Sequence, residues 1–193
     1  AAVLIAFIML LSVVYNAPLG AKANPGLSPN PTKAPWYFAG LQELLLHIHP
    51  LFAFVVLPLI ITGVLILLPY LSYDENTAGV WFASQRGRRM AIVAAVVAIV
   101  FTPLFVLADD LFFDFAAWMR GIPPVVSSGL VPAALILAAL GGFYALMKRK
   151  YSATKNEAVQ AVFVLLLFAF IILTITTVWF RGEGMALTWP WEM

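Results

Sequence analysis

One short stretch of this 193-residue chain gathers residue types that are suited to proton chemistry. The run after Pro35 contains no helix breaker except Gly40, and proline suits the first position of a helix, so a short helix is predicted there. Residues three and four positions apart share a helix face. Trp36, Gly40, Glu43 and His47 therefore fall on one stripe.

That stripe would border a slot for a flat ring that releases protons, because it offers an aromatic side chain, a gap, a carboxylate and an imidazole. Partial burial raises the pKa of a carboxylate toward neutrality, so Glu43 is the candidate proton acceptor. His47, one turn further on, would pass the proton outward. The alternative interpretation is a surface helix with an aromatic belt at the membrane interface and two solvated polar residues. His49, next to Pro50, is assigned a structural role.

The segment before this helix is rich in proline: five of the 13 prolines lie between Pro18 and Pro35. Each proline fixes its own φ and favours extended geometry in the residue before it. The segment is therefore predicted to be stiff and non-helical.

Together, the two parts carry a resemblance to a known family. The sequence ANPGLSPNPTKAPWYFAGLQELL resembles the quinol-site loop in the C-terminal half of cytochrome b, which is a separate subunit IV in cytochrome b6f-type complexes. In that family a proline-rich segment leads into a Pro-Glu-Trp-Tyr-Phe motif. Trp36, Tyr37 and Phe38 match its last three positions, whereas Pro35 stands at the acidic position and Ala34 at the proline position.

The resemblance implies a membrane subunit of a bc-type quinol oxidoreductase that forms part of the positive-side quinol oxidation site. Pro35, Trp36, Tyr37 and Phe38 would then line the quinone pocket. A partner corresponding to the N-terminal half of cytochrome b would hold b-type haem, and a Rieske-type Fe–S or c-type cytochrome subunit would receive electrons. Because the motif acid is missing, either Glu43 takes its role or the chain is a structural scaffold that has lost quinol chemistry.

Composition points independently to a polytopic membrane protein: 63% of residues are hydrophobic, 10% are charged and the mean hydropathy is +0.98. The formal net charge of +2 is too small to indicate nucleic-acid binding. The absence of cysteine excludes disulfides, thiolate metal sites, Fe–S ligation and covalent c-type haem attachment by this chain. With only His47 and His49, the chain cannot ligate a pair of b-type haems, so no metal site is assigned to it.

We predict an all-α membrane bundle, a single domain over residues 1–193 with about five spans. The apolar run 1–15 is shorter than the roughly 20 residues that a span needs. It is interpreted as the end of a span that begins before Ala1. The other predicted parts are the quinol-site loop with its surface helix at 16–50, spans at 51–71, 90–108, 128–147 and 158–180, a short surface helix at 111–119 and a tail at 181–193.

Lysine and arginine favour the cytoplasmic side of a membrane. Seven of the 11 basic residues fall in two loops that five spans would place on the same side: Arg86, Arg88, Arg89, Lys148, Arg149, Lys150 and Lys155. The quinol-site loop, residues 109–126 and the tail would then face the positive side of an energy-transducing, bacterial cytoplasmic membrane.

Other polar residues have both structural and functional interpretations. Asp109, Asp110 and Asp114 form either a solvated span end, with Asp114 near Arg120, or a proton exit or docking surface for a basic electron carrier. The threonines of the last span are expected to bond to carbonyls of their own helix. Those threonines are Thr174, Thr176 and Thr177, and Trp189 and Trp191 are expected at the interface. A transporter is the third class, disfavoured because no charge lies in mid-span.

Overall fold

The computed structural model describes residues 2–14, 32–70, 81–82 and 84–191. Within these ranges the regular elements are helices, and the only β-type pairing is an isolated bridge between Arg181 and Leu187. Four helices are long and apolar enough to cross a membrane, which confirms the prediction of an all-helical membrane protein. They are Phe52–Tyr70, Gln85–Leu111, Val125–Tyr151 and Lys155–Phe180.

The chain divides into two compact units, Ala1–Asn30 and Pro31–Met193. The first contains α1 (Ala2–Val14), an apolar helix. At 1.5 Å per residue α1 is roughly 20 Å long, which is less than the hydrocarbon core of a bilayer. Residues 15–31, which carry most of the predicted proline-rich segment, lie outside the described residues.

The surface helix is present as α2 (Trp36–Leu46), which starts directly after Pro35 as predicted. The extended residues before it are tied to its first turns, because the Gln42 side chain accepts from the Ala34 N–H (2.6 Å) and donates to the Thr32 carbonyl (2.7 Å). The helix ends at Leu46 and His47 caps it.

Two spans begin with a π-helical segment that ends two residues before a proline, Pro58 in one and Pro132 in the other. These segments are η1 (Phe52–Val56), before α3 (Leu57–Leu67) and η2 (Leu68–Tyr70), and η3 (Val125–Leu130), before α6 (Val131–Tyr151). A proline lacks an N–H and its ring crowds the carbonyl four residues earlier, so a wider turn relieves both problems. For Pro132 that carbonyl belongs to Ser128, and it accepts instead from the His49 N–H at 2.8 Å.

Gly129 lets η1 and η3 approach closely, because a Cβ there would lie 2.5 Å from the Phe52 ring. The freed Ser128 carbonyl and this glycine therefore join the start of the α3 span to the start of the α6 span, immediately after α2.

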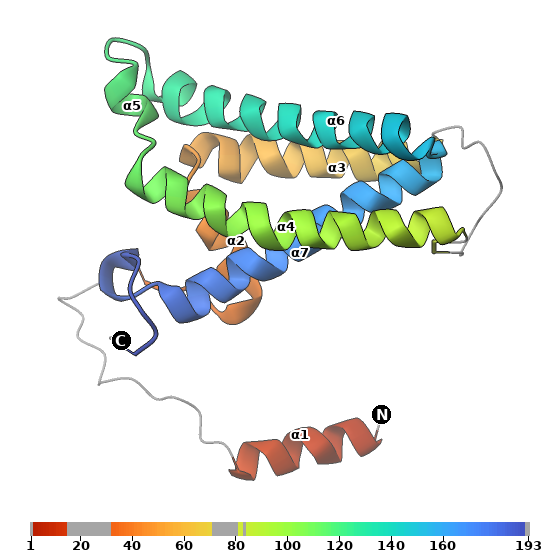
Figure 1. The fold of residues 1–193 in the computed structure, drawn as a ribbon. Coiled ribbons are helices and arrows are strands. Elements are labelled where there is room, and N and C mark those ends of the chain that lie inside the picture. Colours follow the sequence, from red (N-terminus) through yellow and green to blue (C-terminus); the bar gives the residue numbers. More distant parts are fainter. Residues whose placement is uncertain (1, 15–31, 71–80, 83, 192–193) are drawn as a thin grey trace. The chain divides into compact units, whose positions relative to one another are not determined.

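The packing of the bundle is dominated by α4 (Gln85–Leu111) and α7 (Lys155–Phe180), which run side by side, while α2 lies along the far end of α7 (Figure 1). Small residues let these backbones approach closely. One buried cluster joins α4, α6 and α7 and consists of Met90, Ala94, Phe143, Met147, Ala153, Ala158 and Ala161.

A shared carboxylate caps the starts of α4 and α7. Glu157 completes a capping box with Thr154 at the start of α7 and also accepts a hydrogen bond from Ser84, the N-cap of α4. Ser84 Oγ in turn accepts from the Gly87 N–H at 2.9 Å. The partly buried Glu157 carboxylate therefore lies at the N-termini of both helices, where its negative charge interacts favourably with both helix dipoles.

The predicted surface helix at 111–119 is too long. The span helix α4 continues to Leu111, and the separate helix α5 (Phe115–Trp118) is a single turn. Asp114 caps it by accepting from the Ala117 N–H (2.8 Å), and an Asp in this role favours a helix start rather than a helix interior.

Candidate functional site

The stripe predicted on α2 faces another helix of the same chain. Ala39, Gly40 and Glu43 are buried, and a Cβ on Gly40 would lie 2.5 Å from Thr174 Oγ1. The gap at Gly40 is therefore filled by α7. The prediction of an open slot along this stripe is wrong, because α7 occupies the space that a flat ring would need.

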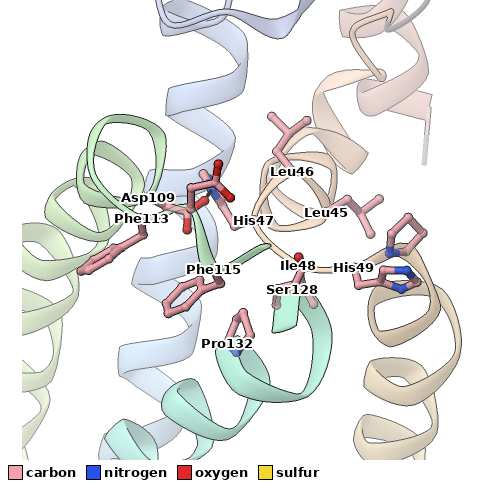
Figure 2. Close-up of a pocket in the computed structure, with 12 residues that line it drawn as sticks. Leu45, Leu46, His47, Ile48, His49, Asp109, Phe113, Phe115, Ser128 and Pro132 are labelled. Carbon is pink, nitrogen blue, oxygen red and sulfur yellow. Dashed lines mark hydrogen bonds and ion pairs between the residues drawn. The ribbon is translucent and has the colours of Figure 1, made fainter. Parts of the chain in front are cut away.

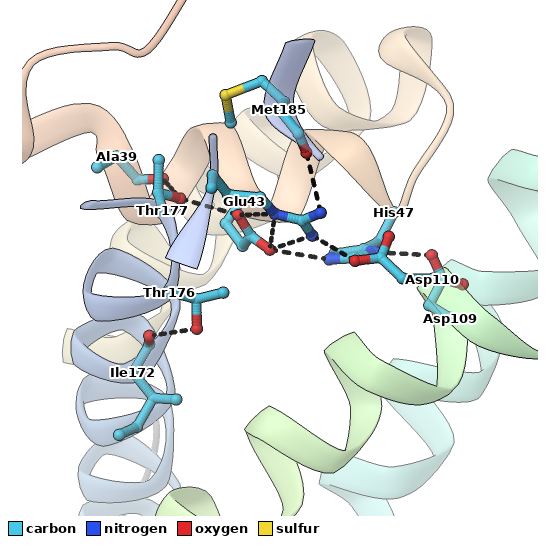
Figure 3. A network of polar contacts seen from close by, with 10 residues as sticks. Ala39, Glu43, His47, Asp109, Asp110, Ile172, Thr176, Thr177 and Met185 are labelled. Atoms are coloured by element: carbon cyan, nitrogen blue, oxygen red, sulfur yellow. Dashed lines mark hydrogen bonds and ion pairs between the residues drawn. The ribbon is translucent and has the colours of Figure 1, made fainter. Parts of the chain in front are cut away.

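Glu43 lies at the centre of a buried polar network (Figure 3). Its Oε1 accepts from Arg181 Nη2 at 2.6 Å and from Nε at 3.0 Å, and Nε is 3.1 Å from Oε2. Thr177 Oγ1 lies 2.9 Å from Glu43 Oε2 and 2.8 Å from the Ala39 carbonyl, so its single proton serves one of these acceptors. This network joins α2 to the end of α7.

His47 extends the network from α2 to the end of α4. Its Nδ1 lies 2.6 Å from Asp109 Oδ2, and its Nε2 lies 3.4 Å from Glu43 Oε1 without the alignment of a hydrogen bond. Arg181 Nη2 also pairs with Asp110 at 2.7 Å. Three carboxylates, one guanidinium and one imidazole therefore meet where α2, α4 and α7 end.

The predicted pKa of Glu43 is wrong in direction. Burial raises the pKa of this carboxyl, as the sequence suggested, but the nearby His47 ring and the hydrogen bonds and charge of Arg181 outweigh it and lower the pKa to about 2. Glu43 is thus a fixed anion in this arrangement and a weak base at neutral pH.

His47 is shifted in the opposite direction. Burial lowers the pKa of the imidazole, but the hydrogen bond to Asp109 and the negative charges of Asp109 and Glu43 raise it to about 9. The ring is therefore cationic at neutral pH. Together with Arg181, it offsets two of the three negative charges, which lowers the free-energy cost of burying Glu43 in this cluster.

Arg181 is held by a small turn that follows α7. Its Nη1 donates to the Met185 carbonyl at 3.0 Å, and the turn is closed by bonds from Gly182 N–H to the Ala186 carbonyl and from Thr188 N–H to the Phe180 carbonyl. Met185 has a φ of +60°, an uncommon conformation for a residue with a side chain. The turn thus directs a carbonyl at a guanidinium that is already shared by two carboxylates.

The three threonines of α7 behave differently. Thr174 and Thr176 donate to the carbonyls of Phe170 (2.8 Å) and Ile172 (3.0 Å), which confirms the prediction for them. The prediction is wrong for Thr177, which contacts α2 instead, because Glu43 and the Ala39 carbonyl are within its reach.

The predicted quinone-pocket residues lie at the opposite end of α2 from His47. Trp36, Tyr37 and Phe38 have exposed fractions of 73%, 56% and 55%, and their rings contact one another with centroids 5.8 Å and 5.0 Å apart. Pro35, also exposed, precedes them as the N-cap. The structure therefore separates the predicted site into an exposed aromatic group and a buried charged group.

A cleft of about 310 Å³ opens beside His47 and Asp109 (Figure 2). Its lining combines apolar side chains from the end of α2 with Phe113 and Phe115 after α4 and with Ser128 and Pro132 near η3. The Asp109 side chain is 17% exposed, whereas Glu43 is sealed. Of the two groups that contact the His47 ring, Asp109 is thus the one that reaches this cleft, while Asp110 is the most exposed member of the network, at 27%.

The network also contains side chains of the kinds that bind metal ions. His47, Asp109 and Asp110 bring ligand atoms within 4.8 Å of one another. Each of them already has a partner, because His47 bonds to Asp109 and Asp110 pairs with Arg181. The guanidinium supplies the positive charge that a bound cation would otherwise provide.

Arg181 and Thr177 were missed as partners of Glu43, since they lie 138 and 134 residues away in sequence. A signal was nevertheless available for Arg181. A buried carboxylate needs a cation, and the predicted positive side offers only Lys22, Lys33, Arg120 and Arg181. Of these, only Arg181 directly follows a spanning helix.

Comparison with known proteins gives no match: no family model fits the chain, and no curated protein and no solved structure is significantly similar to it.

Proposed function

We propose that this chain is a cytochrome b C-terminal-half or subunit IV-like membrane subunit of a bc-type quinol oxidoreductase. It would form one side of the positive-side quinol site, in a bacterial energy-transducing membrane, with a fifth span that includes α1. One observation supports this proposal most directly. A buried ion network holds α2 against the bundle, while Trp36, Tyr37 and Phe38 at the start of α2 are exposed.

In this proposal the aromatic group forms a wall for the quinone ring. Large, flat side chains on a rigid helix provide contact area with little loss of conformational freedom. Pro35 sets the direction of the chain into that wall. The partner subunits hold the haem and the Fe–S or c-type centre, and they receive the two electrons that leave the quinol.

The buried network has two roles in this proposal. Glu43, as a fixed anion bound to Arg181, holds α2 in place and so positions the aromatic group. The cationic His47 and the partly exposed Asp109 provide a route by which a proton reaches the outside. This assigns the outward step to His47, as the sequence suggested, and makes Glu43 a positioning residue.

The proposal is tested on the complex purified through a tag on this chain. Trp36→Ala and Phe38→Ala are expected to slow quinol oxidation by roughly an order of magnitude, because the ring is no longer held in place, while b-type haem content is unchanged. Trp118→Ala is the control, since Trp118 is an exposed aromatic residue at the same end of the bundle but on α5. A purified complex without haem would contradict the proposal.

The second candidate is a structural scaffold within a redox complex. Two observations favour it: Pro35 replaces the acid of the family motif, and Glu43 is sealed in an ion pair. It predicts haem-containing complexes in which the Trp36 and Phe38 variants oxidise quinol at the normal rate.

A further inference from the structure

The end of the bundle opposite the buried network carries a concentrated positive charge. Around the starts of α4 and α7 and the end of α6 lie seven of the chain's 11 basic residues: Arg86, Arg88, Arg89, Lys148, Arg149, Lys150 and Lys155. Among the described residues the only carboxylate at this end is Glu157, which is engaged with Ser84 and Thr154. Arg88, Arg89, Arg149 and Lys150 form no ion pair with a carboxylate among the described residues.

The basic side chains converge because the helices that carry them are packed together. Met90 at the start of α4 and Met147 at the end of α6 are fully buried in one cluster. Arg88 and Arg89 directly precede the first, and Lys148 directly follows the second. Figure 1 shows these helix ends at the same end of the bundle. Arg86 reinforces the arrangement by donating to the Ser152 carbonyl at 2.9 Å.

The length of the helices fixes the depth of this charge in a membrane. The helices Gln85–Leu111 and Val125–Tyr151 have 27 residues each, or roughly 40 Å, against a hydrocarbon core of about 30 Å. Their terminal turns must therefore project beyond the hydrocarbon into the layer that contains lipid phosphates. Arg88, Arg89, Arg149 and Lys150 are exposed in those turns.

We infer that this basic end binds the headgroups of anionic phospholipids. The phosphates and net negative charge of such lipids lie at the same depth as the guanidinium and ammonium groups, so contact requires no departure of the protein from the bilayer. Arginine pairs with phosphate through two parallel hydrogen bonds, and basic clusters next to spans attract anionic lipid. A soluble acidic partner would have to displace these headgroups first.

The test uses the purified protein, with any subunits that accompany it, in nanodiscs of equimolar phosphatidylglycerol and phosphatidylcholine with identical acyl chains. Lipid retained after release into detergent is counted by native mass spectrometry. The wild type is expected to retain phosphatidylglycerol several-fold over phosphatidylcholine, with the preference falling at high salt. R88Q/R89Q and R149Q/K150Q are each expected to reduce that several-fold preference to nearly equal retention of the two lipids.

Two controls separate charge at this end from charge in general. R88K/R89K preserves charge and is expected to retain most of the preference, and R120Q removes an exposed arginine from the opposite end and is expected to leave it unchanged. Each double variant keeps five basic residues at this end, so the protein should insert into the membrane in the same orientation. The orientation is verified with Ser152→Cys, because the chain contains no other cysteine and a thiol label reports on which side this residue lies.

Equal retention of the two lipids by the wild type would overturn the inference, as would double variants that retain phosphatidylglycerol normally. Displacement of the lipid by millimolar inorganic phosphate at constant ionic strength would also overturn it, because the site would then be one for free phosphate.

Discussion

The two ends of the bundle handle charge in opposite ways. At one end, Arg181 and His47 lie against Glu43, Asp109 and Asp110 and offset two of their three negative charges within the chain, and Glu43, His47 and Arg181 are buried. At the other, basic side chains are exposed, and Glu157, the one carboxylate there among the described residues, accepts hydrogen bonds at two helix starts. Buried charges need partners from the same protein, whereas charges at headgroup depth find them in water and lipid.

This difference explains why α2 is held so firmly to the end of α7. The ion network supplies a specific link between a surface helix and two spans, in addition to the close contact at Gly40. The opposite end needs no such link, because its helices are joined directly by the cluster around Met90 and Met147. Substitutions at the two ends should therefore differ greatly in their effect on stability.

The largest effect is expected from Arg181→Met. Removing the guanidinium leaves the buried Glu43 carboxylate without its cation, which costs about 3–5 kcal/mol of unfolding free energy. Thermal unfolding of the purified protein measures it. Replacing both members of the pair, as in E43L/R181M, should recover part of the loss, and a double variant that is no more stable than R181M would contradict the ion-pair explanation.

The next largest effect is expected from Gly40→Leu. The Cβ alone would lie 2.9 Å from the carbonyl oxygen of Phe170, which belongs to the backbone and cannot move aside. The helix α2 must therefore shift, which lowers the unfolding free energy by about 1–3 kcal/mol. Gly141→Leu is the matched control in α6, because a Cβ there meets nothing within 4 Å. If the two variants unfold at the same temperature, α2 does not pack on α7 in this way.

The pH dependence of the unfolding free energy tests whether the cationic His47 imidazole stabilises the folded protein. Its pKa is raised from 6.5 to about 9 in the folded protein, so its contribution is complete below pH 6.5 and is lost as the pH rises through 9. The charged groups around it are Glu43, Asp109, Asp110 and Arg181.

Unfolding temperatures between pH 6 and pH 10 should therefore fall across this window, and the fall should be smaller in His47→Gln. Glu43 acts in the reverse sense, because its pKa is lowered from 4.5 to about 2. Its contribution is present above pH 4.5 and is lost as the pH falls through 2. A wild-type profile identical to that of His47→Gln would show that the imidazole does not gain a proton from the network.

The smallest effect is expected at the basic end, from Ser84→Ala. This change removes the cap of α4 and the hydrogen bond to Glu157, at about 1 kcal/mol. Ser84→Thr keeps the hydroxyl and should restore most of the stability in the same unfolding measurement. A loss as large as that of R181M would mean that the two ends do not differ as described.

Local patterns predicted much of the fold. Runs of apolar residues identified the four long helices, and Pro35 identified the start of α2 to the residue. They did not predict the π segments, because these depend on prolines whose freed carbonyls find partners elsewhere, as Ser128 does with His49. They also overestimated the helix near Phe115, where Asp114 caps a single turn.

The candidate site was predicted in part. Glu43 and His47 do share a face and do lie close together, as the helical spacing required. The error concerned what that face contacts: the spacing could not indicate that α7 fills the gap at Gly40 or that Arg181 reaches Glu43. For the same reason the pKa of Glu43 was expected to rise, since burial was foreseeable and its partner was not.

The sequence by itself determined which segments are helical and apolar, and at which ends of the spans the two signs of charge gather. These properties follow from periodicity and composition within about 20 residues. Only the tertiary structure decided which cation neutralises which carboxylate, because Arg181 and Glu43 are 138 residues apart and meet through the packing of α2 on α7. Because of that packing, Glu43 is an ion-paired residue that links α2 to α7, and not the proton acceptor that the sequence predicted.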